Sequence, residues 1–422
     1  MNLSIRKSRL YEFLPHSLVE WSAFILCLLF FAIRDIPVLL YSGQIIAVAL
    51  IIWYNRRKTP VSYLLVWAGF IIWCLLTILW ASDMNHAGKF LREILQVGIV
   101  AISLYIFSRT LDDQSKLLNY IATCSLVMVA YFVAKTPISE WRSALYSNQT
   151  IASSYDRFGR TIGMHPNTFG TLCSLLAMIW VYQWRITQSK ANLICCAVFI
   201  VLLLFTKSRA SLLYLAVMAL VFWLLEKRKP RKVLARFFVA LLLLSLALWL
   251  LLNNRFLYQL VGYRISGVIA FVTGEGTVDS SISGRNLLIE AGKEMIRDYP
   301  FFGVGAGNFS NNAFNSYGIW RDVYAHNNYI EIWADLGIIG LLLYYIPRFW
   351  CCIQLLKIRR KLSDEEAPLC ALLLAIAIGT LVTDNMKISY EKEPQQILFG
   401  LQFAYCVYMK KRVKPVHSMG LR

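Results

Sequence analysis

The feature of this sequence that most constrains its fold is a series of long apolar runs that recur along most of the chain. A bilayer core about 30 Å thick is crossed by a helix of about 20 mostly apolar residues, and we count about twelve such runs. They lie at residues 17–33, 36–54, 62–80, 91–107, 117–134, 167–184, 190–206, 210–225, 234–252, 329–349, 367–384 and 395–409. Because backbone polar groups cannot stay unpaired in lipid, the runs predict an all-α polytopic membrane protein.

The composition excludes the other classes to which a chain of 422 residues could belong. Hydrophobic residues make up 58% of the chain and charged residues only 16%, with a mean hydropathy of +0.54. Such a chain is too apolar for a water-soluble or a disordered protein. The ten cysteines fall in or beside the apolar runs, so we expect small buried hydrophobic side chains and neither zinc nor redox chemistry.

The net charge of +19 first indicates how the protein lies in the membrane. Basic clusters at residues 56–58, 227–229, 359–361 and 410–412 all fall on the cytoplasmic side if the amino terminus is cytoplasmic, as the positive-inside rule requires. We therefore expect both termini in the cytoplasm, membrane lipids as partners and no nucleic acid.

This orientation predicts how the chain is organised. Residues 1–252 carry the first nine spans, 253–328 form a large helical outer loop with an amphipathic helix, and 329–422 carry the last three spans and a basic cytoplasmic tail. A shorter outer segment lies at residues 135–166. Long loops in a compact protein are commonly functional, so the outer face is where we expect the site.

The large outer loop contains a predicted amphipathic helix that follows Ser283, a possible cap, and ends before Pro300. Helical spacing places four apolar residues on one face of this helix: Leu288, Ala291, Met295 and Ile296. We expect this face to lie either on the membrane or over a cavity. Glycines at 303, 305 and 307 follow. No strand precedes them and no Lys-Ser/Thr follows, which excludes dinucleotide and P-loop sites and leaves either a tight turn with positive φ or part of the ligand site.

Polar residues at the outer mouth are the candidates for chemistry. His326 lies just before the tenth run, where a histidine is more commonly solvated or capping than catalytic. Lys207 and Arg209 lie between two runs with almost no loop; they either snorkel to headgroups or face the mouth of the bundle. Arg285 lies at the beginning of the predicted outer helix, where a guanidinium and a helix amino terminus together form an anion site.

Three segments carry a resemblance to a known family: TKSRAS at 206–211, GRNLLIEAGKEMIRDYPFFGVGAGNF at 284–309 and HNNYIEIWADLGIIG at 326–340. In the last, His326-Asn327 is followed by nine residues and then Gly337-x-x-Gly340. Over residues 203–345 the chain resembles the bacterial O-antigen ligase and O-antigen polymerase superfamily of polytopic glycosyltransferases, closest to O-antigen ligase.

The resemblance implies transfer of a glycan from an undecaprenyl-diphosphate carrier to an acceptor hydroxyl at the periplasmic face of the bacterial inner membrane. It implies His326 as catalytic base, with Arg209 and Arg285 on the donor diphosphate. The chemistry is consistent with these roles, because two forked guanidiniums can neutralise a departing diphosphate without a metal or cofactor. A neutral histidine suits proton removal near neutral pH.

Further outer residues are expected to bind the donor: Lys207, Arg157, Arg160 and Asn327. His165, beside the two arginines, either joins them or only caps the sixth span. Glu331 and Asp335 lie one helical turn apart inside a run and should face a cavity, because a lipid-facing carboxylate costs several kcal/mol; either could orient His326. Three further arginines are expected at the loop surface or at an interface, with binding of the diphosphate or of an anionic acceptor as the alternative: Arg264, Arg297 and Arg321. Asp384, at the outer end of the eleventh run, is a further candidate to face the cavity.

Three functions fit these observations to different degrees. The first is O-antigen ligase, which joins the polymer to the lipid A core oligosaccharide, and it is favoured by the complete histidine motif and the modest length. The alternative is an O-antigen or capsular polysaccharide polymerase, for which the acceptor is a lipid-linked repeat unit. A polysaccharide transporter or flippase would require repeated halves and polar residues near the midplane, whereas here they gather at one mouth.

Overall fold

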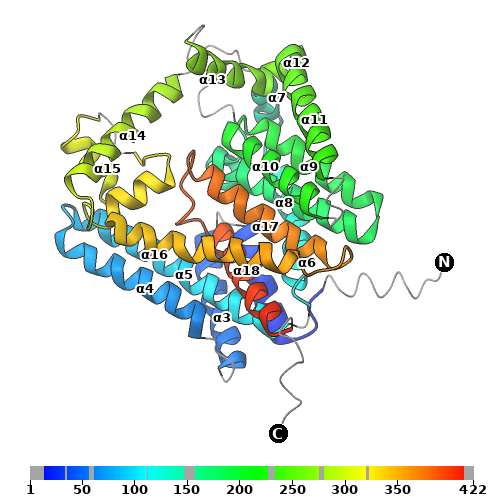
Figure 1. Cartoon of the computed structure of the whole chain (residues 1–422), viewed down its shortest axis with the longest axis horizontal. Helices are drawn as coiled ribbons and strands as arrows, with labels where there is room; N and C mark the ends of the chain where they lie inside the picture. Colours follow the sequence, from blue (N-terminus) through cyan, green and yellow to red (C-terminus); the bar gives the residue numbers. More distant parts are fainter. Residues whose placement is uncertain are drawn as a thin grey trace.

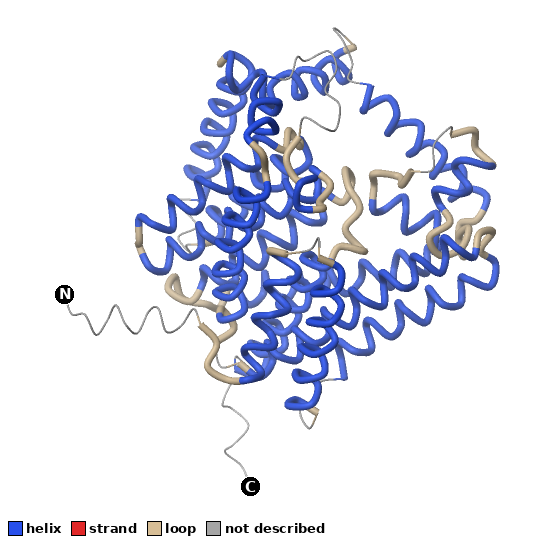
Figure 2. The backbone as a smooth tube through the Cα atoms, turned by 180° about the vertical axis from the view of Figure 1, so that it is seen from behind, coloured by secondary structure: helices blue, strands red, loops and turns tan. Residues whose placement is uncertain are grey.

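The computed structural model describes residues 14–33, 36–56, 61–111, 113–146, 157–226, 233–274, 280–319 and 323–412. Within these ranges all regular structure is helical and no strand occurs, as Figure 2 shows. The elements are α2 (Leu18–Phe31), α3 (Pro37–Asn55), α4 (Val61–Thr77), η1 (Ile78–Trp80), α5 (Met84–Thr110), α6 (Lys116–Lys135), α7 (Ile138–Tyr146), η4 (Arg160–Ile162), α8 (Pro166–Thr187), α9 (Lys190–Phe205), α10 (Arg209–Leu225), α11 (Val233–Asn253), α12 (Arg255–Leu257), the π-helix η6 (Tyr258–Gly262), α13 (Tyr263–Thr273), α14 (Ser280–Asp298), α15 (Phe309–Asn315), α16 (Asn328–Arg359), α17 (Ala367–Thr383) and α18 (Glu393–Arg412).

Each apolar run predicted from the sequence coincides with a helix, namely α2, α3, α4 with η1, α5, α6, α8, α9, α10, α11, α16, α17 and α18. By length and composition, 7 helices of the described chain can cross a membrane. One of them, Arg255–Thr273, lies where only an outer loop was expected. Polar residues interrupt the apolar pattern of that stretch, so it does not stand out in the sequence, whereas the structure joins α12, η6 and α13 into one continuous helical segment.

The helices pack around one large hydrophobic core. Within it α8 packs on α9 and α10, α10 on α17, α5 on α18, and α16 on α17 and α4. By contrast, α11 lies at the edge of the bundle (Figure 1) and leaves its leucines at 241–244 exposed. A soluble monomer rarely exposes so continuous an apolar surface, so this face is suited to lipid. Of the basic clusters used for orientation, residues 57–58 and 227–229 lie outside the described part of the chain.

A break in α16 explains the glycines of the outer loop. Gly337 has φ 67° and ψ −176° inside the helix, and a Cβ there would lie 2.0 Å from the Phe301 carbonyl oxygen. The carbonyl groups released by the break accept N–H groups: Ala334 O from Val304 at 2.8 Å and Asp335 O from Gly305 at 2.9 Å. The glycines at 303, 305 and 307 all have positive φ, which confirms the prediction of a tight turn.

The amphipathic outer helix is α14, and its buried face is largely the one predicted. Leu288, Ala291 and Met295 are buried in a small second core, and α14 packs against α16. The helix begins at Ser280, before the predicted cap Ser283. Arg285 therefore lies in the second turn of α14, one turn after the free N–H groups of the helix start, and the anion site expected there remains a prediction.

Candidate functional site

His326 lies in a strained turn immediately before α16. Its φ is 55°, in the left-handed region that few residues other than glycine adopt. Asn327 caps the helix, with its Oδ1 accepting the N–H of Tyr329 at 3.0 Å and that of Ile330 at 3.2 Å. Strained backbone of this kind persists only where neighbouring contacts hold it, and it gathers at functional sites.

Glu331 stabilises the His326 turn through two hydrogen bonds. Its Oε2 accepts the N–H of Ala325 at 2.7 Å, and its Oε1 accepts the hydroxyl of Tyr390 at 3.3 Å. Glu331 thus contacts the residue next to His326 by way of the backbone. The expectation that it could orient the histidine remains a prediction, now with this route.

Asn328 joins the same turn to the segment between α17 and α18. It is fully buried, and its Oδ1 accepts the N–H groups of Ser389 at 2.7 Å and Tyr390 at 3.1 Å. Its own N–H donates to the Asp384 carbonyl oxygen at 2.7 Å, and its Nδ2 donates to the Tyr345 hydroxyl at 2.8 Å. The start of α16 and the 384–390 segment are therefore one hydrogen-bonded unit.

The imidazole of His326 lines a cavity of about 150 Å³. The other lining residues are His165, Asn167, Thr168, Thr171, Tyr324, Lys387, Ile388, Lys392 and Gln395. The Tyr324 ring centroid lies 4.1 Å from that of His326. Burial, and then the positive charges of Arg285 and His165, lower the pKa of His326 to about 3. The imidazole is therefore neutral near pH 7 and can accept a proton.

His165 both caps the helix of the sixth run and lies at the site, the two roles between which the sequence did not decide. Its Nδ1 accepts the N–H of Asn167 at 3.2 Å, which caps α8, and its side chain lines the His326 cavity. Burial lowers the pKa of His165 to about 4, with further lowering by the charges of Arg157 and Arg160. The two histidines thus face one space as neutral rings.

Arginines surround the tight connection between α9 and α10. The Arg157 Nε donates to the Thr206 carbonyl oxygen at 2.7 Å. A guanidinium nitrogen of Arg264 donates to the Lys207 carbonyl oxygen at 2.8 Å. Arg209 in turn donates to the Arg264 carbonyl oxygen at 3.1 Å. Lys207 itself has φ 52°. These bonds hold three guanidinium groups around one hairpin.

The arginine charges act on one another. Burial, and then the charges of Arg264, Arg285 and Arg209, lower the pKa of Arg157 to about 9. A concentration of buried positive charge is unfavourable unless an anion offsets it. Arg264, which the sequence favoured as a loop-surface or interface residue, lies inside this group of arginines.

The predicted catalytic residues are brought together to different extents. Arg285 is close enough for its charge to act on His326 and on Arg157. Arg209 acts on Arg157, and among the described contacts none joins it directly to His326. Of these three residues, His326 is the one found among the described residues that line the small cavity.

The four residues predicted to bind donor also differ. Arg157 donates to Asn167 Oδ1 at 2.6 Å, and Asn167 lines the cavity, whereas Arg160 lies in η4 and acts on His165 by charge. Lys207 is only 1% exposed, and the Asn327 oxygen is used in capping. Donor binding by these four side chains remains a prediction.

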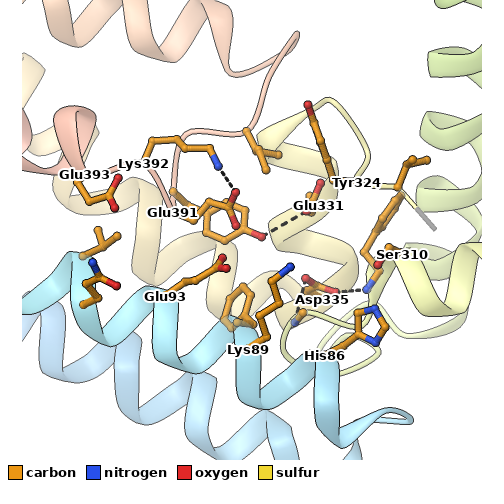
Figure 3. A pocket seen from close by; sticks show the side chains of 18 of the residues that line it. His86, Lys89, Glu93, Ser310, Tyr324, Glu331, Asp335, Glu391, Lys392 and Glu393 are labelled. Carbon is orange, nitrogen blue, oxygen red and sulfur yellow. Dashed lines mark hydrogen bonds and ion pairs between the residues drawn. The ribbon is translucent and has the colours of Figure 1, made fainter. Parts of the chain in front are cut away.

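A larger cavity of about 580 Å³ adjoins the first. Both cavities are lined by Tyr324, Ile388 and Lys392. Figure 3 shows Glu331 and Asp335 of α16 opposite Glu93 and Lys89 of α5, with the Lys392–Glu391 ion pair above them. The prediction that Glu331 and Asp335 face a cavity is confirmed.

The segment between α17 and α18 contributes cavity residues that were not predicted from the sequence. Lys387, Glu391, Lys392 and Glu393 all line one or both cavities. A signal was present, since this short stretch between two apolar runs is dense in charged residues, and charged groups beside a bundle mouth commonly mark a substrate path.

Metal ligation has no structural support within the described ranges. No group of three or more His, Cys, Asp or Glu side chains there is arranged to hold a metal ion. All ten cysteines are free, and all except the half-buried Cys195 are buried, as expected for small apolar side chains.

Comparison with known protein families supports the resemblance inferred from the three sequence motifs. Residues 193–345 match the family described as O-antigen ligase. The matched region begins in α9, contains the arginine hairpin, α14 and the His326 turn, and ends within α16. No curated protein matches this sequence closely enough to serve as a relative.

Proposed function

Because this chain carries a domain of the O-antigen ligase family at residues 193–345, we propose that it is an O-antigen ligase of the bacterial inner membrane. It transfers an O-antigen polysaccharide from undecaprenyl diphosphate to a sugar hydroxyl of the lipid A core, at the periplasmic face. The observation that carries the proposal is the gathering of guanidinium charge beside a neutral histidine that lines a cavity.

The arginines bind the donor diphosphate in this proposal. A guanidinium offers paired N–H groups that match phosphate oxygens. Arg209 and Arg285 take the oxygens that gain charge as the anomeric bond breaks, and Arg157 and Arg264 add to the positive potential that draws the donor in. Each phosphate oxygen bound there offsets the mutual repulsion of the arginines.

His326 then removes the proton of the acceptor hydroxyl. The acceptor oxygen bonds to the anomeric carbon, the bond from that carbon to the phosphate oxygen breaks, and its electron pair leaves with undecaprenyl diphosphate. Attack opposite the leaving group inverts the anomeric configuration, so an α-linked donor gives a β-linked product.

Donor binding also activates the base. With a pKa of about 3, the His326 imidazole is a weak base in the empty site. A bound diphosphate places negative charge beside Arg285 and offsets the charge that lowers the pKa of His326. Burial, the larger cause of the lowering, remains, so donor binding makes His326 a stronger base through the electrostatic contribution of Arg285 alone.

Purified protein in liposomes tests the base. His326→Ala should abolish transfer from a lipid-linked glycan to a lipid A core acceptor, with protein level and donor binding retained. His16→Ala, which changes a histidine that lines neither cavity, should transfer at the wild-type rate. Full activity of His326→Ala would exclude His326 as the base.

The lipopolysaccharide ladder of a deletion strain distinguishes the acceptor. Loss of all attached polymer with accumulation of lipid-linked polymer supports the ligase. A core capped by a single repeat unit would instead identify the polymerase.

A further inference from the structure

The two adjoining cavities differ in their ionisable groups. The small cavity with His326 is lined by Lys387 and Lys392, and no Asp or Glu is found among the described residues that line it. Five carboxyl groups line the larger cavity: Glu93, Glu331, Asp335, Glu391 and Glu393. Against them stand two ammonium groups, those of Lys89 and Lys392. The small cavity is therefore lined by basic groups and the larger one mainly by acidic groups, and Tyr324, Ile388 and Lys392 lie between them.

The larger cavity also has a volume and aromatic lining residues that suit a glycan. Its volume of about 580 Å³ falls in the range of small-molecule sites, about 300–1,000 Å³. Aromatic residues line it beside the carboxyl groups: Tyr41, Phe90, Phe309, Tyr324 and Tyr390. Ring faces pack against the apolar faces of sugars, and carboxylate oxygens accept hydrogen bonds from hydroxyls.

Not all of the carboxyl groups face a ligand equally. Asp335 already accepts the N–H groups of Phe309 at 2.6 Å and Gly307 at 3.2 Å, and Glu331 is bound to Ala325 and Tyr390. Glu93 projects from α5 on the opposite wall, across from these two residues (Figure 3). Glu93 contacts the Glu391 side chain within the cavity, and it is the carboxyl group that can be replaced without removing the backbone hydrogen bonds that Glu331 and Asp335 accept.

We propose that the larger cavity holds the accepting end of the acceptor glycan, and that its carboxylates select ends bearing hydroxyl or amino groups and no anionic group. This inference rests on the proposed transferase function. The diphosphate of the donor is drawn to the arginine side of His326, while a phosphate or uronic acid on the acceptor would meet a cavity in which carboxyl groups outnumber ammonium groups. The two substrates are thereby sorted by charge.

Two synthetic acceptors that differ only in the terminal sugar test this specificity. One ends in a neutral hexose and the other in the corresponding hexuronic acid. Wild-type protein should use the neutral acceptor with at least about tenfold higher kcat/KM, and Glu93→Gln should narrow that ratio about fivefold, mainly through a lower KM for the anionic acceptor. The KM for the lipid-linked donor should not change.

Matched variants separate this effect from a loss of folding. Lys89→Glu adds a carboxylate to the same cavity, so it should widen the ratio instead of narrowing it. Glu290→Gln changes an exposed glutamate of α14 outside both cavities and should leave the ratio as in wild type.

Three results would overturn the proposal: equal use of both acceptors by wild-type protein, a higher donor KM in Glu93→Gln, or the same direction of change in Glu93→Gln and Lys89→Glu. A higher donor KM would assign the cavity to the donor glycan. Binding of the two free oligosaccharides, measured without donor, gives the same comparison without turnover. If wild-type protein prefers the neutral oligosaccharide but never transfers to it, the proposed function fails while the selection by the cavity stands.

Discussion

The titration of His326 is the most direct physical test of the site. Its pKa is lowered from 6.5 to about 3, and a difference of this size corresponds to at most about 5 kcal/mol against protonation, less whatever solvent reaches the ring. The imidazole should therefore stay neutral well below the pH at which an exposed histidine gains its proton. Burial is the larger cause, and the charge of Arg285 is the next.

Nuclear magnetic resonance of protein labelled with ¹⁵N at histidine can follow this titration. The chain has 5 histidines, so the His326 signal is identified by its loss in His326→Gln. Between about pH 8 and pH 5 its ring nitrogens should keep the shifts of a neutral imidazole. A midpoint between about 6 and 7 would show that burial and Arg285 do not act as described.

A substitution at Arg285 isolates the electrostatic contribution to the lowered pKa of His326. Arg285→Gln removes a positive charge near the ring, so it should raise the pKa of His326. Arg297→Gln, an exposed position at the other end of α14, serves as the control and should leave the titration unchanged. Identical titrations in the two variants would rule out the action of Arg285 on the imidazole. Undecaprenyl diphosphate, by offsetting the same charge, should also raise the pKa of His326 in wild-type protein.

Other predictions concern activity and stability. Because the base must be neutral and is neutral above its pKa, kcat/KM should not fall on the acid side until well below pH 6.5; a fall centred near that value would contradict it. Arg209→Lys and Arg285→Lys should restore little of the transfer lost in the alanine variants, since an ammonium lacks the fork; equal activity of lysine and arginine would exclude paired contacts. Gly337→Ala should lower the thermal unfolding temperature, with a cost of at least about 2 kcal/mol from the positive φ and the contact with Phe301, whereas Gly88→Ala, in open space, should be tolerated. A chelator should leave transfer by the purified protein unchanged, and inhibition reversed by magnesium would disprove the metal-free proposal.

The sequence predicted the helices well because the bilayer requirement for apolar residues is strong and local. It also predicted the buried face of α14, since Leu288, Ala291 and Met295 follow helical spacing. It placed the start of α14 too late, because Ser283 is a plausible cap whereas the helix begins at Ser280. Boundaries depend on contacts beyond the local pattern, which a single sequence does not reveal.

The site was harder to predict than the helices. His326 and Arg285 stood out through their motifs, but Lys387, Lys392 and Glu93 acquire their place only when α17, α18 and α5 pack beside α16. Arg264 looked like a surface residue because its bond to the Lys207 carbonyl oxygen joins positions far apart in the chain. Charged residues carry no spacing rule that indicates which distant segment they will face.

The hydrogen bonds of Asn328 have a mechanical consequence. They lock the His326 turn to the segment that carries Lys387 and Lys392, so one wall of the reaction space is rigid. Arg285 is held differently, because it lies on α14, which packs on α16 through an apolar face. The position of the imidazole is therefore fixed by directional hydrogen bonds, whereas the position of the guanidinium beside it depends on non-directional contacts between two helices.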